Sequence, residues 1–194
     1  MINVKFKDFI TLQRGFDLPK NKRSKGKYPV IASTSIDGFH NNYKVNPPGI
    51  VTGRSGSLGF VQYINNKFWP LNTTLWVKDF KGNIPKYVFY LLKTLHLEKY
   101  NSGVGVPTLN KNHLDELEIN IHNHKDQIKI SSIIANYDYL INNNLNRIKI
   151  FQEILEKLYN EWFSNFNISK YNKSILSHPY FSIVKENIKK YSGK

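Results

Sequence analysis

Apolar residues recur at two different spacings along this chain, and the change of spacing divides it into two regions. Up to about residue 120 they fall in short runs separated by polar, glycine-containing links, which is typical of short strands and loops. Strands are predicted at residues 11–13, 28–32, 49–52, 58–64, 73–78 and 117–121. Pro85 opens a predicted helix, because apolar residues follow it at helical spacing and proline is tolerated in a first helical turn.

The second region reads as one long helix. Residues 126–163 contain neither glycine nor proline, and apolar residues recur there at intervals of seven, which indicates a helix packed against another helix. At 1.5 Å per residue the helix would be about 55 Å long, more than a small domain needs. It either folds back on its own domain or forms an intermolecular coiled coil, and its length favours the coiled coil. The apolar stripe comprises Ile134, Ile141, Leu145, Ile148, Leu155, Tyr159 and Trp162.

These patterns predict an α+β fold, in which a mixed domain of small strands is followed by one long coiled-coil helix. We expect the domain at residues 1–124 and the helical region at residues 125–165. The tail, residues 166–194, is expected to contain a short helix that starts near Pro179.

The charge balance points to a polyanionic partner. Lys and Arg number 28 against 14 Asp and Glu, which gives a net charge of +14 at pH 7. Biased codon usage toward Lys, Asn, Ile and Tyr is the alternative cause. The chain has no cysteine, which excludes disulfides, thiol nucleophiles and cysteine zinc sites. No apolar stretch reaches the length of a membrane span and the N-terminus lacks a signal-peptide core, so we expect a cytoplasmic protein without membrane contact.

Motifs that carry chemistry are incomplete in this sequence. Asn46-Pro-Pro-Gly49 is similar to the Asn-Pro-Pro-aromatic motif of amino-methyltransferases, but its fourth residue is glycine and no cofactor-binding unit precedes it. The glycine-rich segment 53–59 matches no phosphate-binding pattern. His122 and His124 have no cluster of further metal ligands nearby in the sequence. We therefore expect neither catalytic residues nor a bound metal.

Basic and small polar residues in the loops have the composition of a DNA-binding surface. A basic loop at residues 20–25 suits phosphates, and serine, threonine and asparagine side chains suit groove edges. Arg54 stands between glycines, where it can reach a groove or a phosphate. The predicted DNA-binding residues are Lys20, Lys22, Arg23, Lys25, Ser33, Thr34, Ser35, Arg54, Ser55, Ser57, Asn72, Thr73, Thr74, Ser102, Lys111 and Asn112.

Several ordered segments together resemble the specificity subunit of type I restriction–modification systems. The most distinctive is Gly49-Ile-Val-Thr-Gly-Arg-Ser-Gly-Ser-Leu-Gly-Phe-Val61, and the resemblance covers residues 1–165. Instead of the family's proline-rich segment and Glu-Gln before the long helix, this chain has His122-Asn-His-Lys-Asp-Gln127. The other matching segments are residues 12–15, 28–33, 38–41, 68–70, 73–77, 90–92, 102–107, Leu109 and 158–163.

The resemblance implies a target-recognition domain that reads one half of a bipartite DNA site, and a helical region that docks methyltransferase and translocase (restriction) subunits. S-adenosylmethionine, Mg²⁺ and ATP would then be bound only by those subunits, and this chain would transfer no methyl group. The usual subunit has two recognition domains and two helices, whereas this chain has one of each. An antiparallel homodimer reading an interrupted palindrome is therefore expected. A heterodimer with a second half-subunit, a truncated product, a stand-alone methyltransferase and a scaffold that binds no DNA are the alternatives.

Overall fold

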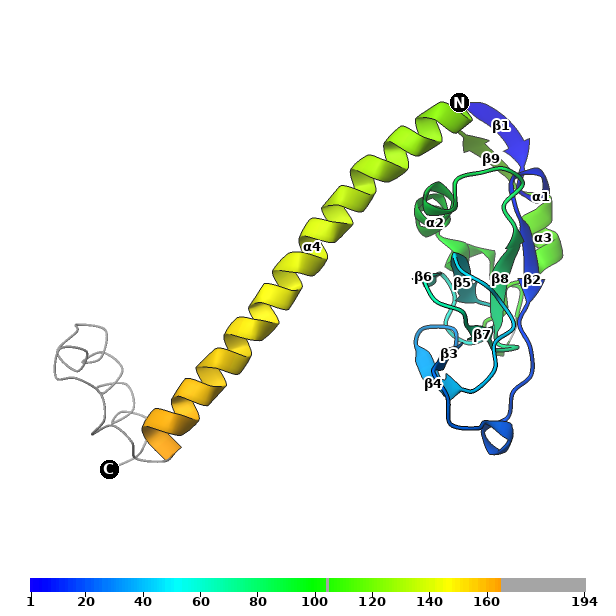
Figure 1. The fold of residues 1–194 in the computed structure, drawn as a ribbon. Helices are drawn as coiled ribbons and strands as arrows, with labels where there is room; N and C mark the ends of the chain where they lie inside the picture. The colour runs from blue at the N-terminus through cyan, green and yellow to red at the C-terminus, as the bar shows by residue number, and fades with distance from the viewer. Residues whose placement is uncertain (104, 165–194) are drawn as a thin grey trace. The chain divides into compact units, whose positions relative to one another are not determined.

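The computed structural model describes residues 1–103 and 105–164 (Figure 1). The chain divides into two compact units, Met1–Tyr137 and Asp138–Lys194. The first unit contains the described strands and short helices, and the long helix runs from the first unit into the second. The predicted short helix near Pro179 lies outside the described residues.

A four-stranded antiparallel sheet forms the centre of the first unit. Its order is β2-β8-β5-β6, with β2 at Thr11–Arg14, β8 at Thr74–Asp79, β5 at Gly49–Gly53 and β6 at Val61–Ile64. The predicted hairpin of β5 and β6 is confirmed by their antiparallel register, which pairs Gly49 with Ile64. The second strand starts at Val61 and not at Leu58, because the turn extends through Gly59, whose backbone has φ +84°.

Two smaller sheets lie toward opposite ends of this unit (Figure 1). One has the order β4-β3-β7, with β4 at Ile36–His40, β3 at Tyr28–Ile31 and β7 at Trp69–Pro70. The other pairs β1 (Ile2–Lys5) with β9 (Glu118–Ile121). That pairing brings the start of the chain to the strand that precedes the long helix. Strands β1, β4 and β7 were not predicted from the sequence.

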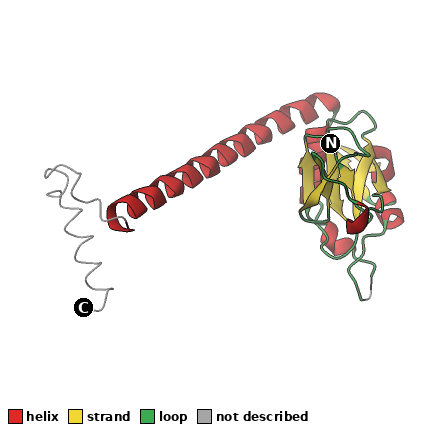
Figure 2. Ribbon diagram, turned by 60° about the horizontal axis from the view of Figure 1, so that its bottom comes forward, coloured by secondary structure: helices red, strands yellow, loops and turns green. Residues whose placement is uncertain are grey.

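The strands gather in the middle of the first unit, and short helices lie around them (Figure 2). The helix predicted at Pro85 is confirmed as α2, Pro85–Thr94, whose Val88 and Leu92 are buried in the main core. Phe6 and Phe9 of α1 and Leu114 of α3 are fully buried in the same core. The remaining short elements are α1 at Phe6–Phe9, α3 at Lys111–Asp115, η1 at Lys20–Lys22 and η2 at Leu97–Tyr100.

The long helix α4 spans His124–Tyr159 and is followed by a π-helical turn at Asn160–Ser164. The predicted combination of a mixed-strand domain with one long helix is thereby confirmed. Gln127 and Ser131 of α4 are buried, and Ile130 and Ile134 pack against the main core. The first turns of α4 consequently belong to the first compact unit, which extends to Tyr137. Among the described helices, none is both long enough and apolar enough to cross a membrane.

Candidate nucleic-acid interface

Arg54 lies in the glycine-rich turn after β5, and backbone hydrogen bonds hold it on both sides. A Cβ atom on Gly53 would lie 1.9 Å from the carbonyl oxygen of Ser57, so the chain folds back on itself at a distance only glycine allows. The Arg54 amide donates to the Thr73 carbonyl oxygen at 2.8 Å, and the Arg54 carbonyl accepts from the Leu109 amide at 2.8 Å. The side chain of Arg54 therefore projects from a fixed piece of backbone.

The loop of residues 101–109 is joined to this turn by backbone hydrogen bonds. The Gly56 amide donates to the carbonyl oxygen of Pro107 at 2.9 Å. Within the loop, the Ser102 amide and hydroxyl both donate to the Thr108 carbonyl, at 2.9 and 3.0 Å. The Asn101 side-chain oxygen accepts from the Thr108 amide at 2.8 Å. Residues about fifty positions apart in the sequence thus form one surface.

A pocket of about 300 Å³ opens where these loops meet the end of β2 and the start of α3. Three cationic side chains from three separate segments line it, namely Arg14, Arg54 and Lys111. We call it the basic pocket. Its other lining residues are Leu75, Ser102, Thr108, Leu109 and Asn110.

The charges of the basic pocket are only partly neutralised. Lys111 pairs with Asp115 at 3.3 Å. Within the described part of the chain, no carboxylate lies within salt-bridge distance of Arg14 or Arg54. Arg14 is oriented by a hydrogen bond of 3.2 Å from its Nε to the Asn72 carbonyl oxygen. A pocket lined by two guanidinium groups that have no carboxylate partner is suited to an anion.

Arg14 is the cationic residue of the basic pocket that sequence reasoning did not select as a contact. It lies in the segment 12–15 that resembles the family, but nothing in its local sequence distinguishes it from other arginines. Arg54, Ser102 and Lys111 were selected, and the structure brings all three together in the pocket.

Two residues that were predicted to contact DNA form hydrogen bonds inside the domain instead. Ser33 is buried, and its hydroxyl lies 3.2 Å from the Ser55 carbonyl oxygen and 3.1 Å from that of Thr73. Thr74 is fully buried, and its hydroxyl donates to the Leu71 carbonyl at 2.7 Å. Neither hydroxyl is available to a ligand in this structure, so we remove both from the set of candidate DNA contacts.

The predicted basic loop also separates into exposed and internal residues. Lys20, Lys22 and Lys25 are exposed. Arg23 is instead held by Asp37, with 2.8 Å between Nη2 and the carboxylate, and by the Leu18 carbonyl at 3.3 Å from Nε. None of the four lines the basic pocket. The remaining predicted residues, Thr34, Ser35, Ser57, Thr73 and Asn112, are exposed, while Ser55 and Asn72 are partly buried.

Local geometry explains the incomplete methyltransferase-like motif. A Cβ on Gly49 would lie 2.1 Å from Cε1 of the buried Phe68 ring, so an aromatic side chain has no room at this position. His122 is engaged with Tyr87, whose hydroxyl lies 2.9 Å from Nδ1. No group of three or more metal-ligand side chains occurs among the residues that the structure describes.

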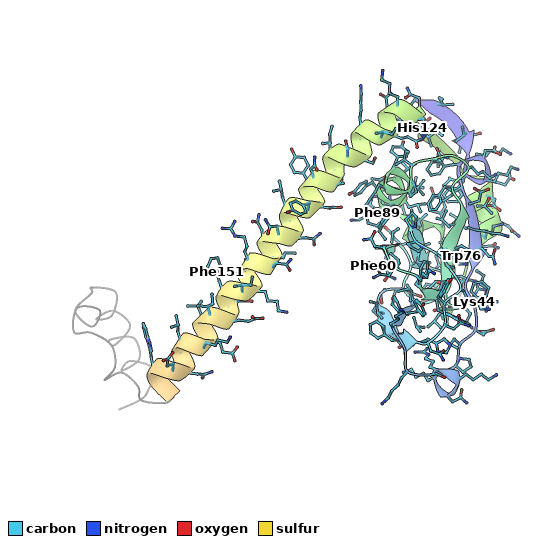
Figure 3. The ribbon with its side chains drawn as sticks, viewed as in Figure 1. Lys44, Phe60, Trp76, Phe89, His124 and Phe151 are labelled. Carbon is cyan, nitrogen blue, oxygen red and sulfur yellow. The ribbon has the colours of Figure 1, made fainter. Side chains whose placement is uncertain are left out.

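The apolar stripe of α4 behaves differently at its two ends. Ile134 packs against the core of the first unit. Ile141, Leu145, Ile148, Leu155 and Tyr159 are more than half exposed, Leu155 by 65%. Phe151, labelled on the helix in Figure 3, is exposed to a similar degree. Trp162 is partly buried. The middle of α4 thus presents large apolar side chains to solvent in the single chain, which is costly without a partner.

The fold and the basic pocket define a mixed α+β recognition domain whose last strand runs into a long helix. The chain belongs to the family of type I restriction modification DNA specificity domains, whose model matches residues 2–156.

Relatives and a solved structure agree with this assignment. The chain is 30% identical over 135 residues to the type I restriction enzyme MjaIX specificity subunit of Methanocaldococcus jannaschii, covering 63% of this chain and 30% of that protein. It is 26% identical over 125 residues to the EcoprrI specificity subunit of Escherichia coli, covering 63% of this chain and 31% of the subunit. The fold is similar to that of the type I restriction–modification S subunit from M. genitalium, with a TM-score of 0.74 and 20% sequence identity. The matched region covers 91% of this chain and 48% of that subunit. The chain thus spans about a third of the curated relatives and about half of that subunit.

Proposed function

We propose that this chain recognises double-stranded DNA as a specificity polypeptide of a type I restriction–modification system. The observation that carries the proposal is the basic pocket, in which Arg14, Arg54 and Lys111 converge in a domain of this family. The net charge of +14 adds a general attraction for a polyanion. Recognition, and not catalysis, is the proposed role.

Two features of Arg54 support its proposed role as a contact residue. Its backbone is fixed by two hydrogen bonds of 2.8 Å, while its guanidinium has no acidic partner among the described residues. A guanidinium binds two acceptors at once, either two oxygens of a phosphate or the O6 and N7 atoms of a guanine. Ser102, Thr108 and Asn110 supply further polar groups around it. We propose that Arg54 contacts DNA through this pocket.

Fluorescence anisotropy of duplex DNA titrated with the full chain tests the proposal. Arg54→Ala should weaken binding about 5- to 150-fold, because a good bidentate contact contributes about 1–3 kcal/mol. Arg54→Lys keeps the charge but loses the bidentate geometry, so it should bind with intermediate affinity. Lys78→Ala, an exposed lysine of β8 outside the pocket, is the matched control. An Arg54→Ala protein that binds as tightly as the Lys78→Ala protein would contradict the proposed contact.

We further propose that two copies associate through the exposed part of the apolar stripe. An isologous antiparallel pair of α4 helices would cover the side chains from Ile141 to Tyr159 and supply two identical recognition domains related by a twofold axis. Such a dimer would read two inverted half-sites, that is, an interrupted palindrome. A second, different half-subunit is the alternative occupant. Duplexes selected from a random pool should share two identical inverted half-sites, whereas unequal half-sites would support the heterodimer.

Methylation and cleavage are proposed to reside in separate methyltransferase and restriction subunits that dock on the helical region. S-adenosylmethionine, Mg²⁺ and ATP would accordingly be bound by those subunits, in the cytoplasm of a prokaryote. Isothermal titration of the isolated chain with S-adenosylmethionine tests this division. No heat of binding is expected, and saturable binding would favour a methyltransferase working alone.

A further inference from the structure

A second cationic surface lies outside the basic pocket, at the sheet formed by β4, β3 and β7. Tyr28 pairs with His40 at the start of β3, and Gly26 packs so closely that a Cβ there would lie 2.3 Å from Asn41 Cα. Segments 26–28 and 40–43 are therefore neighbours. We call the surface the lysine–tyrosine patch. It comprises Lys27, Tyr28, Tyr43, Lys44 and Lys67.

Backbone hydrogen bonds bring the third segment to this surface. The amides of Lys44 and Val45 both donate to the Phe68 carbonyl oxygen, at 3.0 and 3.1 Å. The Phe68 amide in turn donates to the Val45 carbonyl at 3.1 Å. The segment that carries Lys67 is thereby placed beside the segment that carries Lys44, although the two lysines are 23 positions apart in the sequence.

Each of the three lysines lies over an aromatic ring. The Lys67 ammonium lies 4.4 Å from the Tyr43 ring centroid and donates to its hydroxyl at 3.0 Å. Lys27 lies 5.6 Å from the Tyr28 centroid, and the Tyr28 and Tyr43 rings are 5.0 Å apart. Lys44 lies 5.1 Å from the Trp69 ring. Attraction to the ring faces holds these flexible side chains in place, so less side-chain entropy is lost when a ligand binds.

The lysines of the patch have no acidic partner, unlike several other cationic side chains of the domain. Lys5 and Lys7 share Glu116, and Arg23 pairs with Asp37. In the described ranges, no carboxylate lies within salt-bridge distance of Lys27, Lys44 or Lys67. The hydrogen bond to Tyr43 raises the pKa of Lys67 above its ordinary value of 10.5. Three ordered positive charges therefore remain uncompensated.

We propose that the lysine–tyrosine patch is a second DNA contact, which holds the phosphodiester backbone without regard to base sequence. Lys27, Tyr28, Asn66 and Lys67 line a pocket of about 440 Å³ that has room for a phosphate group. It shares no residue with the basic pocket. The inference rests on the proposed function and assigns to that function a separate surface.

Backbone contact follows from the chemistry of these side chains. Lysine ammonium groups are point charges that suit phosphates, without the fork geometry that reads guanine. The Tyr28 and Tyr43 rings already interact with Lys27 and Lys67, so they are poorly suited to stack on bases. The exposed Lys20, Lys22 and Lys25 stand in the segment that leads directly into Lys27 and extend the positive surface.

The test is the triple variant Lys27→Gln/Lys44→Gln/Lys67→Gln in the full chain, titrated against a random-sequence duplex and a duplex selected for tight binding. Affinity for both duplexes should fall by the same factor. The slope of log affinity against log salt should become shallower by about 2.7, because each lost phosphate contact removes about 0.9. The variant Lys27→Arg/Lys44→Arg/Lys67→Arg keeps the charges and should retain the original slope.

The matched control is Lys78→Gln/Lys86→Gln/Lys93→Gln, which removes the same charge elsewhere. Lys86 and Lys93 also lie over aromatic rings, at 3.9 Å from Tyr63 and 5.3 Å from Phe89. An equal loss in this control, or a loss confined to the selected duplex, would overturn the patch as a backbone contact. An unchanged slope in the patch variant would overturn it while the Arg54 contact stands. If the unaltered chain binds neither duplex, the proposed function falls as well.

Discussion

The side-chain amide of Gln127, on the first turn of α4, donates to the side-chain oxygen of Asn83 at 2.7 Å. Gln127 is only 2% exposed, and its side chain makes two further hydrogen bonds. It donates to the His122 carbonyl at 2.9 Å and accepts from the Ile84 amide at 3.0 Å. Because Ile84 precedes the first residue of α2, Gln127 ties the start of the long helix to the start of α2.

Loss of these bonds should destabilise the domain. Gln127→Ala leaves the Ile84 amide and the Asn83 side-chain oxygen without their partner, and we expect a loss of about 2 kcal/mol in the free energy of unfolding. Urea denaturation followed by circular dichroism measures it. Asn146→Ala, an exposed amide on the same helix, should change stability by less than about 0.5 kcal/mol. Equal stability of the two variants would show that Gln127 does not tie the elements together.

The Ser33 hydroxyl should support the loops that carry Arg54. Ser33→Ala removes the hydrogen bond shared by the Ser55 and Thr73 carbonyls and should cost about 1 kcal/mol. DNA affinity should fall as well, since the Thr73 carbonyl also fixes the Arg54 amide. Ser132→Ala changes an exposed serine of α4 outside the predicted DNA contacts and is the control. Thermal unfolding and anisotropy of both variants check the expectation, which fails if they behave alike.

Glu116 should make stability depend on pH in the acid range. Hydrogen bonds from Lys5 and then Lys7, at 2.6 and 2.8 Å, lower the pKa of Glu116 to about 2 from its ordinary value of 4.5. A depressed pKa in the folded state stabilises the protein above the ordinary pKa, and this contribution disappears as pH falls from about 4.5 to about 2. Glu116→Gln should therefore lower Tm at pH 7, and the difference from the unaltered chain should vanish near pH 2.

A double-mutant cycle identifies the lysines as the cause. In a Lys5→Gln/Lys7→Gln background, Glu116→Gln should have little effect on Tm at any pH of this range, because the partners are already absent. A pH-dependent difference that persists in this background would assign the effect to other groups.

Two isoleucines on α4 offer a matched test of the dimer. Ile148 and Ile150 are 53% and 54% exposed. A step of two residues turns the side-chain direction by about 200°, so the two isoleucines lie on nearly opposite faces of the helix. Ile148→Lys introduces a charge into the apolar stripe and should shift the dimer to monomer, whereas Ile150→Lys should leave the dimer intact. Light scattering at micromolar concentration measures the mass. A monomeric unaltered chain would contradict the homodimer.

Periodicity along the chain was sufficient to predict the elements whose hydrophobic pattern is strong. The seven-residue repeat from Ile134 onward predicted the long helix, and Pro85 predicted the start of α2. The Gly49–Ile64 hairpin was predicted from two apolar runs and a glycine-rich link. In each case the element is defined by a pattern in one continuous stretch of the chain, so the local sequence carries the information.

The strand pairings and the composition of the basic pocket depend on contacts between segments that are distant in the sequence. Strand β1 pairs with β9, which places Asn3 opposite Asn120, and neither strand reveals its partner in the sequence. Arg14 joins Arg54 and Lys111 only because the end of β2, the turn after β5 and the start of α3 meet in space. Ser33 is likewise buried because distant segments meet around it, and its hydroxyl bonds to the Ser55 and Thr73 carbonyl oxygens.

The class of fold, the basic character of the chain and the long apolar stripe can all be predicted from composition and periodicity. Which cations converge, which hydroxyls are buried and how far the first compact unit extends along α4 depend on the packing of distant segments. A side chain's neighbours are set by the packing of the whole domain, and Gln127 shows this plainly. Its sequence neighbours describe an ordinary polar helix start, while its hydrogen bonds reach Asn83 and Ile84.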